Sequence, residues 1–290
     1  MEGSIVSSAA AAMAAGDDAP EIETAIHRGV IALSQIVLNF LEKDIELTRI
    51  CRLAALLHES GVSTETALFR DLAQKCIETQ RDDGGWTDVL ETTWCTTFLD
   101  LFGELSNPVE KAYKWLGDQR NNEGGWGKND RDSARIPVTG LLLYMLPRLS
   151  SDKDLHWLEE KWQQEQQNDP CLSYKAAFTL MAFGRNSYYP KDKTLITNTV
   201  KWMSDQQNDD GGWAPWKGHP VGSDPWCTGI AIAGFLQYPD EISEGVIRKA
   251  LQWLQDTQLS NGLWPYHYID DGSAWALYSL VHVYRFLGKK

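Results

Sequence analysis

Residues 80–86, with the sequence QRDDGGW, decide the fold of this chain because close variants of the segment recur along it. The variants are QRNNEGGW at 119–126, QNDDGGW at 207–213 and QLSNGLW at 258–264. Their tryptophans are 40, 87 and 51 residues apart, and the long interval is about two periods. A degenerate copy is therefore expected near residue 170, where QNDPCLSY at 167–174 has Tyr in place of Trp. Such a period indicates a stack of similar supersecondary units that share one core.

Each unit is predicted to be a helix, a loop and a second helix. The first helix has apolar residues at helical spacing and ends at the Gln, and the glycines stop it. The second helix is apolar and rich in small residues, which suits an inner ring. The expected inner helices are 96–103, 139–146, 176–184, 228–236 and 274–287, and an N-terminal pair is expected at 21–41 and 45–60. Six outer and six inner helices predict an all-α fold, a single (α/α)6 toroid.

The motif side chains have a structural interpretation. The indole is a large apolar plate, and the Gln amide can bond to nearby backbone, so the two together brace neighbouring helix pairs. We therefore interpret the motif tryptophans as structural rather than substrate-binding.

The overall amino-acid composition limits the classes of partner and the compartment that the sequence favours. The 290 residues are 43% hydrophobic and 23% charged, and 27 basic against 40 acidic residues give a net charge of −13. This charge disfavours nucleic acid and anionic membranes as partners. The five cysteines lack CxxC pairs, which favours a reduced, cytoplasmic setting. Residues 1–20 are expected to be a flexible Ala/Ser-rich tail before a toroid at 21–290, and no transmembrane segment is expected.

The repeats and the small-residue helices that follow them resemble the terpenoid cyclase and protein prenyltransferase toroid superfamily. By motif, the chain is most similar to squalene–hopene and oxidosqualene cyclases. The resemblance covers about residues 21–290. It implies that chemistry occurs at the mouth of the barrel formed by the N-termini of the inner helices.

Two adjacent carboxylates, Asp270 and Asp271, are expected at this mouth of the barrel. Residues 268–277, YIDDGSAWAL, resemble the acid motif D-x-D-D-T-A of class II cyclases, with Tyr268 at its first Asp and Gly272 at its Thr. By position, the resemblance implies that Asp270 is the general acid and Asp271 its paired carboxylate, and His267 is a candidate to orient Asp270 or to return the proton. Asp130 and Asp132 form a second partial match. Asp is also a favoured N-cap, and this alternative is open for Asp132 and for Asp224, which precedes a proline.

Protonation of an alkene requires a carboxyl that still carries its proton when substrate arrives. A free Asp has a pKa of about 3.9, which burial and a neighbouring carboxylate both raise. The carbocations that follow need aromatic faces. The candidate substrate-binding residues are Trp94, Trp216, Trp226, Tyr266, Tyr268 and Trp275.

The sequence therefore favours a class II terpene cyclase-like enzyme that acts on a hydrophobic isoprenoid and requires no cofactor, with the need for Mg²⁺ left open. One alternative is a prenyltransferase-like enzyme that binds Zn²⁺ through Asp224, Cys227 and His267, a sensible ligand set for zinc. Another is a non-catalytic toroid that binds a ligand or a protein partner.

Overall fold

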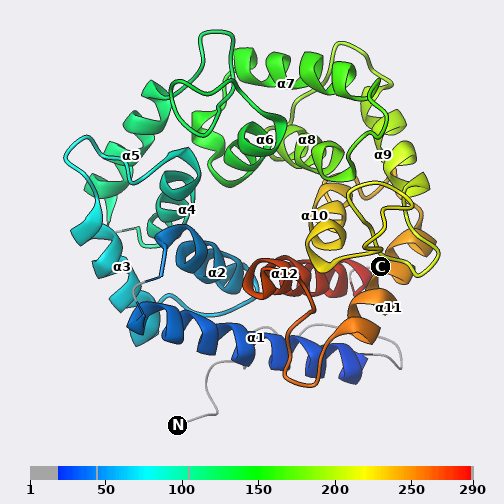
Figure 1. The fold of residues 1–290 in the computed structure, drawn as a ribbon, viewed down its shortest axis with the longest axis horizontal. Helices are drawn as coiled ribbons and strands as arrows, with labels where there is room; N and C mark the ends of the chain where they lie inside the picture. The colour runs from blue at the N-terminus through cyan, green and yellow to red at the C-terminus, as the bar shows by residue number, and fades with distance from the viewer. Residues whose placement is uncertain (1–18, 44, 104, 289–290) are drawn as a thin grey trace.

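A computed structural model describes residues 19–43, 45–103 and 105–288 and shows two concentric rings of helices (Figure 1). Within these residues there are twelve α-helices and no strand, so the predicted all-α toroid is confirmed. The outer helices are α1 (Ala19–Glu42), α3 (Ala67–Thr79), α5 (Ser106–Asp118), α7 (Asp152–Glu165), α9 (Leu195–Asp205) and α11 (Glu244–Thr257). The inner helices are α2 (Leu47–Glu59), α4 (Val89–Asp100), α6 (Ile136–Met145), α8 (Ser173–Arg185), α10 (Pro225–Phe235) and α12 (Ile269–Leu287). A 3-10 turn, η2 (Pro147–Leu149), follows α6.

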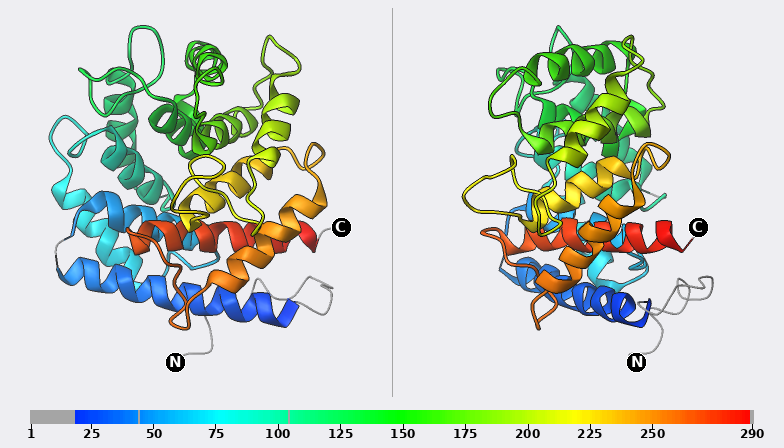
Figure 2. Two further views of the ribbon diagram at one scale, coloured as in Figure 1. Left: turned by 45° about the vertical axis from the view of Figure 1, so that its right-hand side comes forward. Right: turned by 90° about the vertical axis from the view of Figure 1, so that its right-hand side faces the viewer.

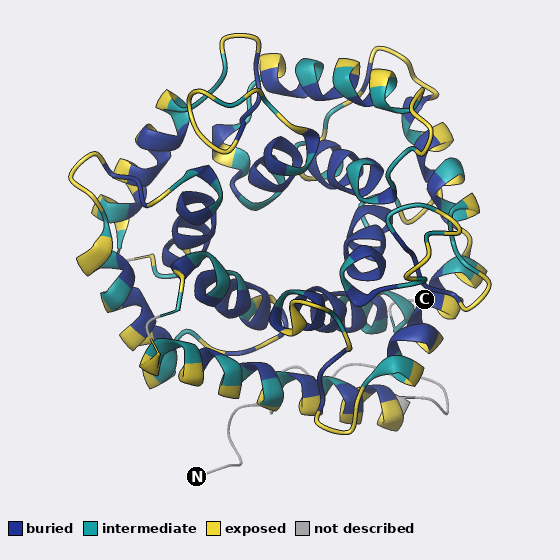
Figure 3. Cartoon of the chain, viewed as in Figure 1, coloured by how far each residue is buried: buried dark blue, intermediate teal, exposed yellow. Residues whose placement is uncertain are grey.

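The two rings differ in how their side chains are buried. Each inner helix packs against the next, and α12 packs against α2, so that the inner ring is closed. Inner helices such as α10 are buried on nearly every side, whereas outer helices such as α5 bury one face and expose the other (Figure 3). A helix that is apolar all round belongs in a core, and an amphipathic helix belongs at its surface. The composition of each helix therefore places it in its ring.

Five of the six inner helices begin earlier than the sequence predicted, whereas α2 begins at Leu47, two residues later than expected. Helix α4 begins at Val89 rather than at residue 96, because Asp88 caps it by accepting a hydrogen bond from the Glu91 backbone N–H. Helix α10 begins at Pro225 for the same reason, with Asp224 as its N-cap. Of the predicted tail at residues 1–20, residues 1–18 lie outside the described part of the chain. Its last two residues, Ala19 and Pro20, belong to α1.

The motif glutamines join neighbouring repeats through backbone carbonyls. The Gln80 amide donates to the carbonyl of Gly84 in its own loop and to that of Pro108 at the next outer helix, at 2.8 and 2.9 Å. Gln207 makes the equivalent pair of bonds. Each motif glutamine of this kind therefore ties the end of one outer helix to the start of the next.

The motif tryptophans hold the outer and inner rings together. The Trp213 indole N–H donates to the carbonyl of Met203 on α9, and its backbone N–H donates to the Thr228 hydroxyl on α10, at 2.8 and 2.9 Å. The other three motif tryptophans make the same two bonds, the second of them to a Thr or Ser of the following inner helix. All four are buried braces, in agreement with the structural interpretation.

The last motif closes the ring against the first helix. The Gln258 amide donates to the carbonyls of Gly262 and of Ala25 on α1, at 3.0 and 2.9 Å. Gly262 has a φ of +86°, and a Cβ on it would lie 2.4 Å from the carbonyl oxygen of Arg28. The bond from Gln258 to α1 therefore joins the last repeat to the first in the same way as the bonds from Gln80 and Gln207 join sequential repeats.

The sequence predicted no transmembrane segment, but helix α1 meets the criteria of length and apolar composition for one. Its residues Pro20–Glu42 are long and apolar enough to cross a membrane, by length and composition only. In the fold, α1 packs against α2, α3 and α12 as part of the outer ring. Its exposed face carries Ile31 and Leu38, which are 56% and 41% exposed.

Candidate active site

One mouth of the inner ring contains an apolar cavity of about 220 Å³. This mouth faces the viewer in Figure 1, and Figure 2 shows the loops before the inner helices projecting on the same side. All six inner helices contribute to its wall, and only two charged side chains do. The lining residues are Thr48, Arg52, Leu90, Trp94, Pro137, Val138, Leu141, Phe178, Trp226, Asp271 and Trp275.

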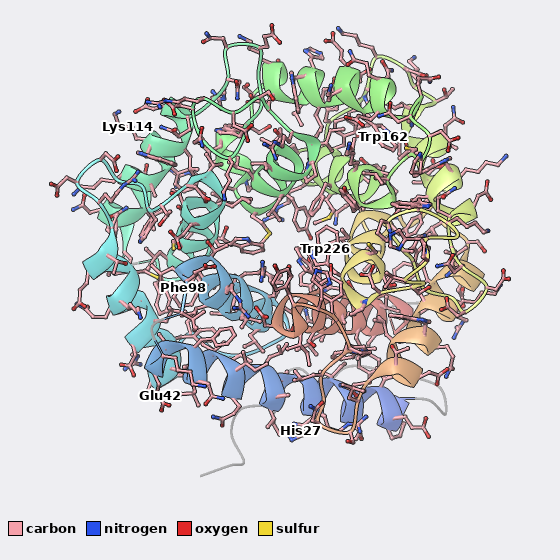
Figure 4. The ribbon with its side chains drawn as sticks, in the orientation of Figure 1. His27, Glu42, Phe98, Lys114, Trp162 and Trp226 are labelled. Carbon is pink, nitrogen blue, oxygen red and sulfur yellow. The ribbon has the colours of Figure 1, made fainter. Side chains whose placement is uncertain are left out.

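Three tryptophans from different helices form most of the aromatic part of this wall, and Phe178 is the fourth aromatic residue. Trp94 on α4 and Trp275 on α12 meet edge to face, with ring centroids 6.3 Å apart. Trp226 on α10 packs against Tyr174 and Phe178 of α8, at 5.5 and 6.1 Å, and lies toward the centre of the ring (Figure 4). The structure therefore brings together three of the six aromatic residues expected to bind substrate.

Asp270 is held in an ion pair with two arginines of α2. Arg49 donates two hydrogen bonds to it, at 2.7 and 3.0 Å, and an Arg52 nitrogen lies 3.5 Å away. Burial alone would raise the pKa of Asp270, which is 1% exposed, but the hydrogen bonds and charges of Arg49 and Arg52 outweigh it and hold the pKa below its usual value. A carboxyl kept ionised in this way does not carry the proton that alkene protonation needs. The structure thus argues against the predicted acid role of Asp270.

Asp271 has the opposite environment. It lies in the cavity wall and is 18% exposed, and burial followed by the Asp270 charge raises its pKa, although Arg52 opposes the shift. Its Oδ1 atom lies 3.2 Å from the Arg52 Nε, and within the described residues neither atom has a hydrogen-bond partner. Two neighbouring carboxyls thus have pKa values pushed apart, the pattern that separates an acid from its anionic partner.

The segment before α12 carries three aromatic rings in succession. His267 packs between Tyr266 and Tyr268, with centroid distances of 4.1 and 4.7 Å. His267 and Tyr268 are exposed, and the three rings are absent from the cavity lining.

The second predicted acid pair lies in a surface loop. Asp132 accepts hydrogen bonds from the Lys128 backbone N–H and from Arg135, and these bonds lower its pKa. Asp130 is exposed, and neither residue lines the cavity. Their arrangement braces a loop rather than presenting an acid. Trp216 is likewise in a loop, where it packs on His219 at 4.2 Å.

The zinc candidates use their polar atoms in other ways. Asp224 accepts from the Cys227 backbone N–H at 2.7 Å, which confirms the N-cap interpretation. Burial raises the pKa of Asp224 and raises that of the Cys227 thiol well above its usual value, so the thiol keeps its proton. Among the described residues, the one group of potential ligands with converging donor atoms is elsewhere, at Cys51, Cys76 and Cys95.

Sequence reasoning missed Arg49 and Arg52, which set the charge state of the carboxyl pair. They lie three residues apart and therefore on one face of α2. Two arginines on one face of an inner helix were the signal available in the sequence. Their meeting with residues 270–271 could not be foreseen from spacing, because more than 215 positions separate them.

The opposite mouth of the ring is polar. A cavity of about 360 Å³ is lined there by Glu59, Asp100, Arg185 and His282 among others. The hydroxyls of Tyr144 and Tyr278 are hydrogen-bonded in its wall. The two ends of the toroid thus offer different chemistry, and the carboxyl with the raised pKa, Asp271, lies at the apolar end.

Comparisons with known proteins agree with this architecture. No family model matches the chain. It is 32% identical over 243 residues to squalene–hopene cyclase of Zymomonas mobilis, a match that covers 65% of this chain and 37% of that protein. It is 24% identical over 103 residues to protostadienol synthase A of Arthroderma gypseum, covering 32% of this chain and 14% of that one. The chain therefore spans little more than a third of the length of the first relative.

Solved structures extend the likeness to the whole ring. The type II terpene cyclase MstE from Scytonema superposes with a TM-score of 0.68 at 15% identity, over 92% of this chain and 98% of that one. A variant of the same enzyme in complex with its substrate, geranylgeranyl dihydroxybenzoate, gives a TM-score of 0.69 at 14% identity, over 92% and 99%. At these identities the likeness concerns the fold.

Proposed function

We propose that this chain is a member of the terpenoid cyclase toroid superfamily and a class II terpene cyclase-like enzyme that starts ring closure by protonating an isoprenoid. The observation that carries the proposal is the raised pKa of Asp271 in an apolar cavity walled by tryptophan. A carboxyl that keeps its proton beside apolar surface can transfer that proton to a carbon–carbon double bond or an epoxide.

The neighbouring residues fit this role for Asp271. Asp270, ionised by Arg49, places a fixed negative charge beside it, which favours the protonated form of Asp271. Once Asp271 has given up its proton, Arg52 at 3.2 Å stabilises the new carboxylate. The arrangement thus favours a protonated acid before reaction and tolerates an anion after it.

The cavity wall suits the cation that forms next. An aromatic face over a desolvated cation contributes roughly 2 kcal/mol or more. Trp94, Trp226 and Trp275 lie on three helices around the cavity, so a carbocation that migrates during ring closure meets an aromatic face in more than one position. The proposed substrate is a hydrophobic isoprenoid, and the proposed chemistry needs no metal.

The test is product formation from a panel of C15 to C30 isoprenoids in the presence of EDTA. We expect cyclic product from at least one member, and loss of at least 100-fold in turnover for Asp271→Asn. Asp132→Asn is the matched control, since that carboxyl lies in a surface loop, and its turnover should equal that of the wild type. If no member gives product, or if Asp271→Asn retains full turnover, the proposal fails.

A further inference from the structure

Three cysteines that are far apart in the sequence meet at one point in the core. Cys51 on α2, Cys76 on α3 and Cys95 on α4 all have their sulfur atoms within 4.8 Å of one another. The Cys51 sulfur lies 3.3 Å from that of Cys76 and 3.7 Å from that of Cys95. All three are free thiols with 0% exposure.

This spacing fits coordination of one ion. A first-row metal ion bound equally to three sulfurs at about 2.3 Å needs sulfurs about 4.0 Å apart. The Cys51 contacts, at 3.3 and 3.7 Å, are shorter than this by about 0.7 and 0.3 Å. To hold an ion in their plane, the three sulfurs would therefore have to move apart by less than about 1 Å.

The chemistry of the donors decides which ion fits. The group contains sulfur alone, without the carboxylates and imidazoles that accompany harder ions. Zinc in proteins almost always takes four ligands, and full burial leaves no water to serve as the fourth. Thiolates select Cu(I) among the ions that need fewer ligands.

We propose that Cys51, Cys76 and Cys95 form a buried three-sulfur site for one Cu(I) ion, which joins α2, α3 and α4. Binding would release thiol protons to solvent. None of the three cysteines lines the apolar cavity, and the site does not depend on the proposed cyclase activity. Its effect would be to fix the helix that carries Arg49 and Arg52.

The experiment titrates the full chain, purified without oxygen and with its five thiols reduced, with Cu(I) against bathocuproine disulfonate. We expect one Cu(I) per chain and an X-ray absorption spectrum with three sulfurs at about 2.3 Å. Cys95→Ser should lose the bound ion. Cys171→Ser, which removes a thiol outside the group, should retain it.

Three results would overturn the proposal. The first is no uptake by the wild type in competition with the chelator. The second is equal uptake by folded Cys95→Ser, with folding checked by circular dichroism. The third is stoichiometric zinc in the protein as isolated. If Cys95→Ser does not fold, the number of sulfurs in the wild-type spectrum decides, and fewer than three contradicts the site.

Discussion

Replacing Gly262 with alanine tests how the ring is closed. Gly262 has a φ of +86°, and its added Cβ would lie 2.4 Å from the carbonyl oxygen of Arg28 and 2.7 Å from the carbonyl carbon. Both atoms belong to the backbone of α1, so they cannot rotate away as a side chain could. The matched control is Gly61, which has a φ of +105° and no atom within 4 Å of its added Cβ.

The expected cost follows from these two environments. A left-handed conformation costs a residue with a Cβ roughly 1–2 kcal/mol, and this term applies to both glycines. The smaller entropy of the unfolded alanine chain offsets about 0.4–1 kcal/mol of it in both variants. Overpacking adds roughly 1–3 kcal/mol at Gly262 alone. We therefore expect Gly61→Ala to lower the free energy of unfolding by about 1 kcal/mol and Gly262→Ala by about 2–4 kcal/mol.

The assay is equilibrium unfolding in urea, followed by tryptophan fluorescence and by circular dichroism, with midpoints compared at equal slope. The wild type and both variants are measured at pH 7 and 25 °C. Equal costs for the two variants, or a larger cost at Gly61, would refute the claim that the last repeat packs closely on α1.

Three further predictions follow from the site and the braces. Turnover should fall as pH rises through the raised pKa of Asp271, because the acid acts in its protonated form, and a rate that climbs with pH would contradict this. Asp270→Asn should cost about 1–3 kcal/mol of unfolding free energy at pH 7 by leaving the partly exposed Arg49 unpaired. Because the folded pKa of Asp270 is lowered, its contribution is present above the usual Asp pKa of about 3.9 and is lost as pH falls through the folded value, so urea unfolding of the variant should converge on wild type in acid. Trp213→Phe should cost about 1–3 kcal/mol, since it leaves a gap in the core and removes the bond to a carbonyl of α9, whereas Trp216→Phe in its loop should shift the thermal midpoint little.

The repeat predicts the fold well because its residues act locally. A Gln, a Gly and a Trp at fixed spacing make the same bonds in several copies, so the sequence contains the rule for stacking them. Even here one copy differs. In the repeat with an extra residue, Arg120 makes the link toward the next repeat by donating to the Leu149 carbonyl of η2 at 2.5 Å.

The site was less predictable because its contacts are long-range. Residues 270 and 271 are adjacent carboxyls at the start of one helix, and spacing cannot say which one meets an arginine of α2. The same limit applies to the cysteines, which appear scattered in the sequence but converge because α2, α3 and α4 are neighbours. Local sequence patterns therefore predict the helical ring. The charge states of the carboxyl side chains depend on how the helices of the ring pack against one another.

The most direct test of the proposed function is the origin of the proton. The enzyme is incubated in D2O with the isoprenoids that it converts, and the cyclic product is examined by mass spectrometry and NMR. Because the carboxyl of Asp271 exchanges with solvent, the account predicts one deuterium at the carbon protonated first, and no such product from Asp271→Asn. A cyclic product without deuterium, or one that forms only from a diphosphate substrate with release of diphosphate, would contradict it.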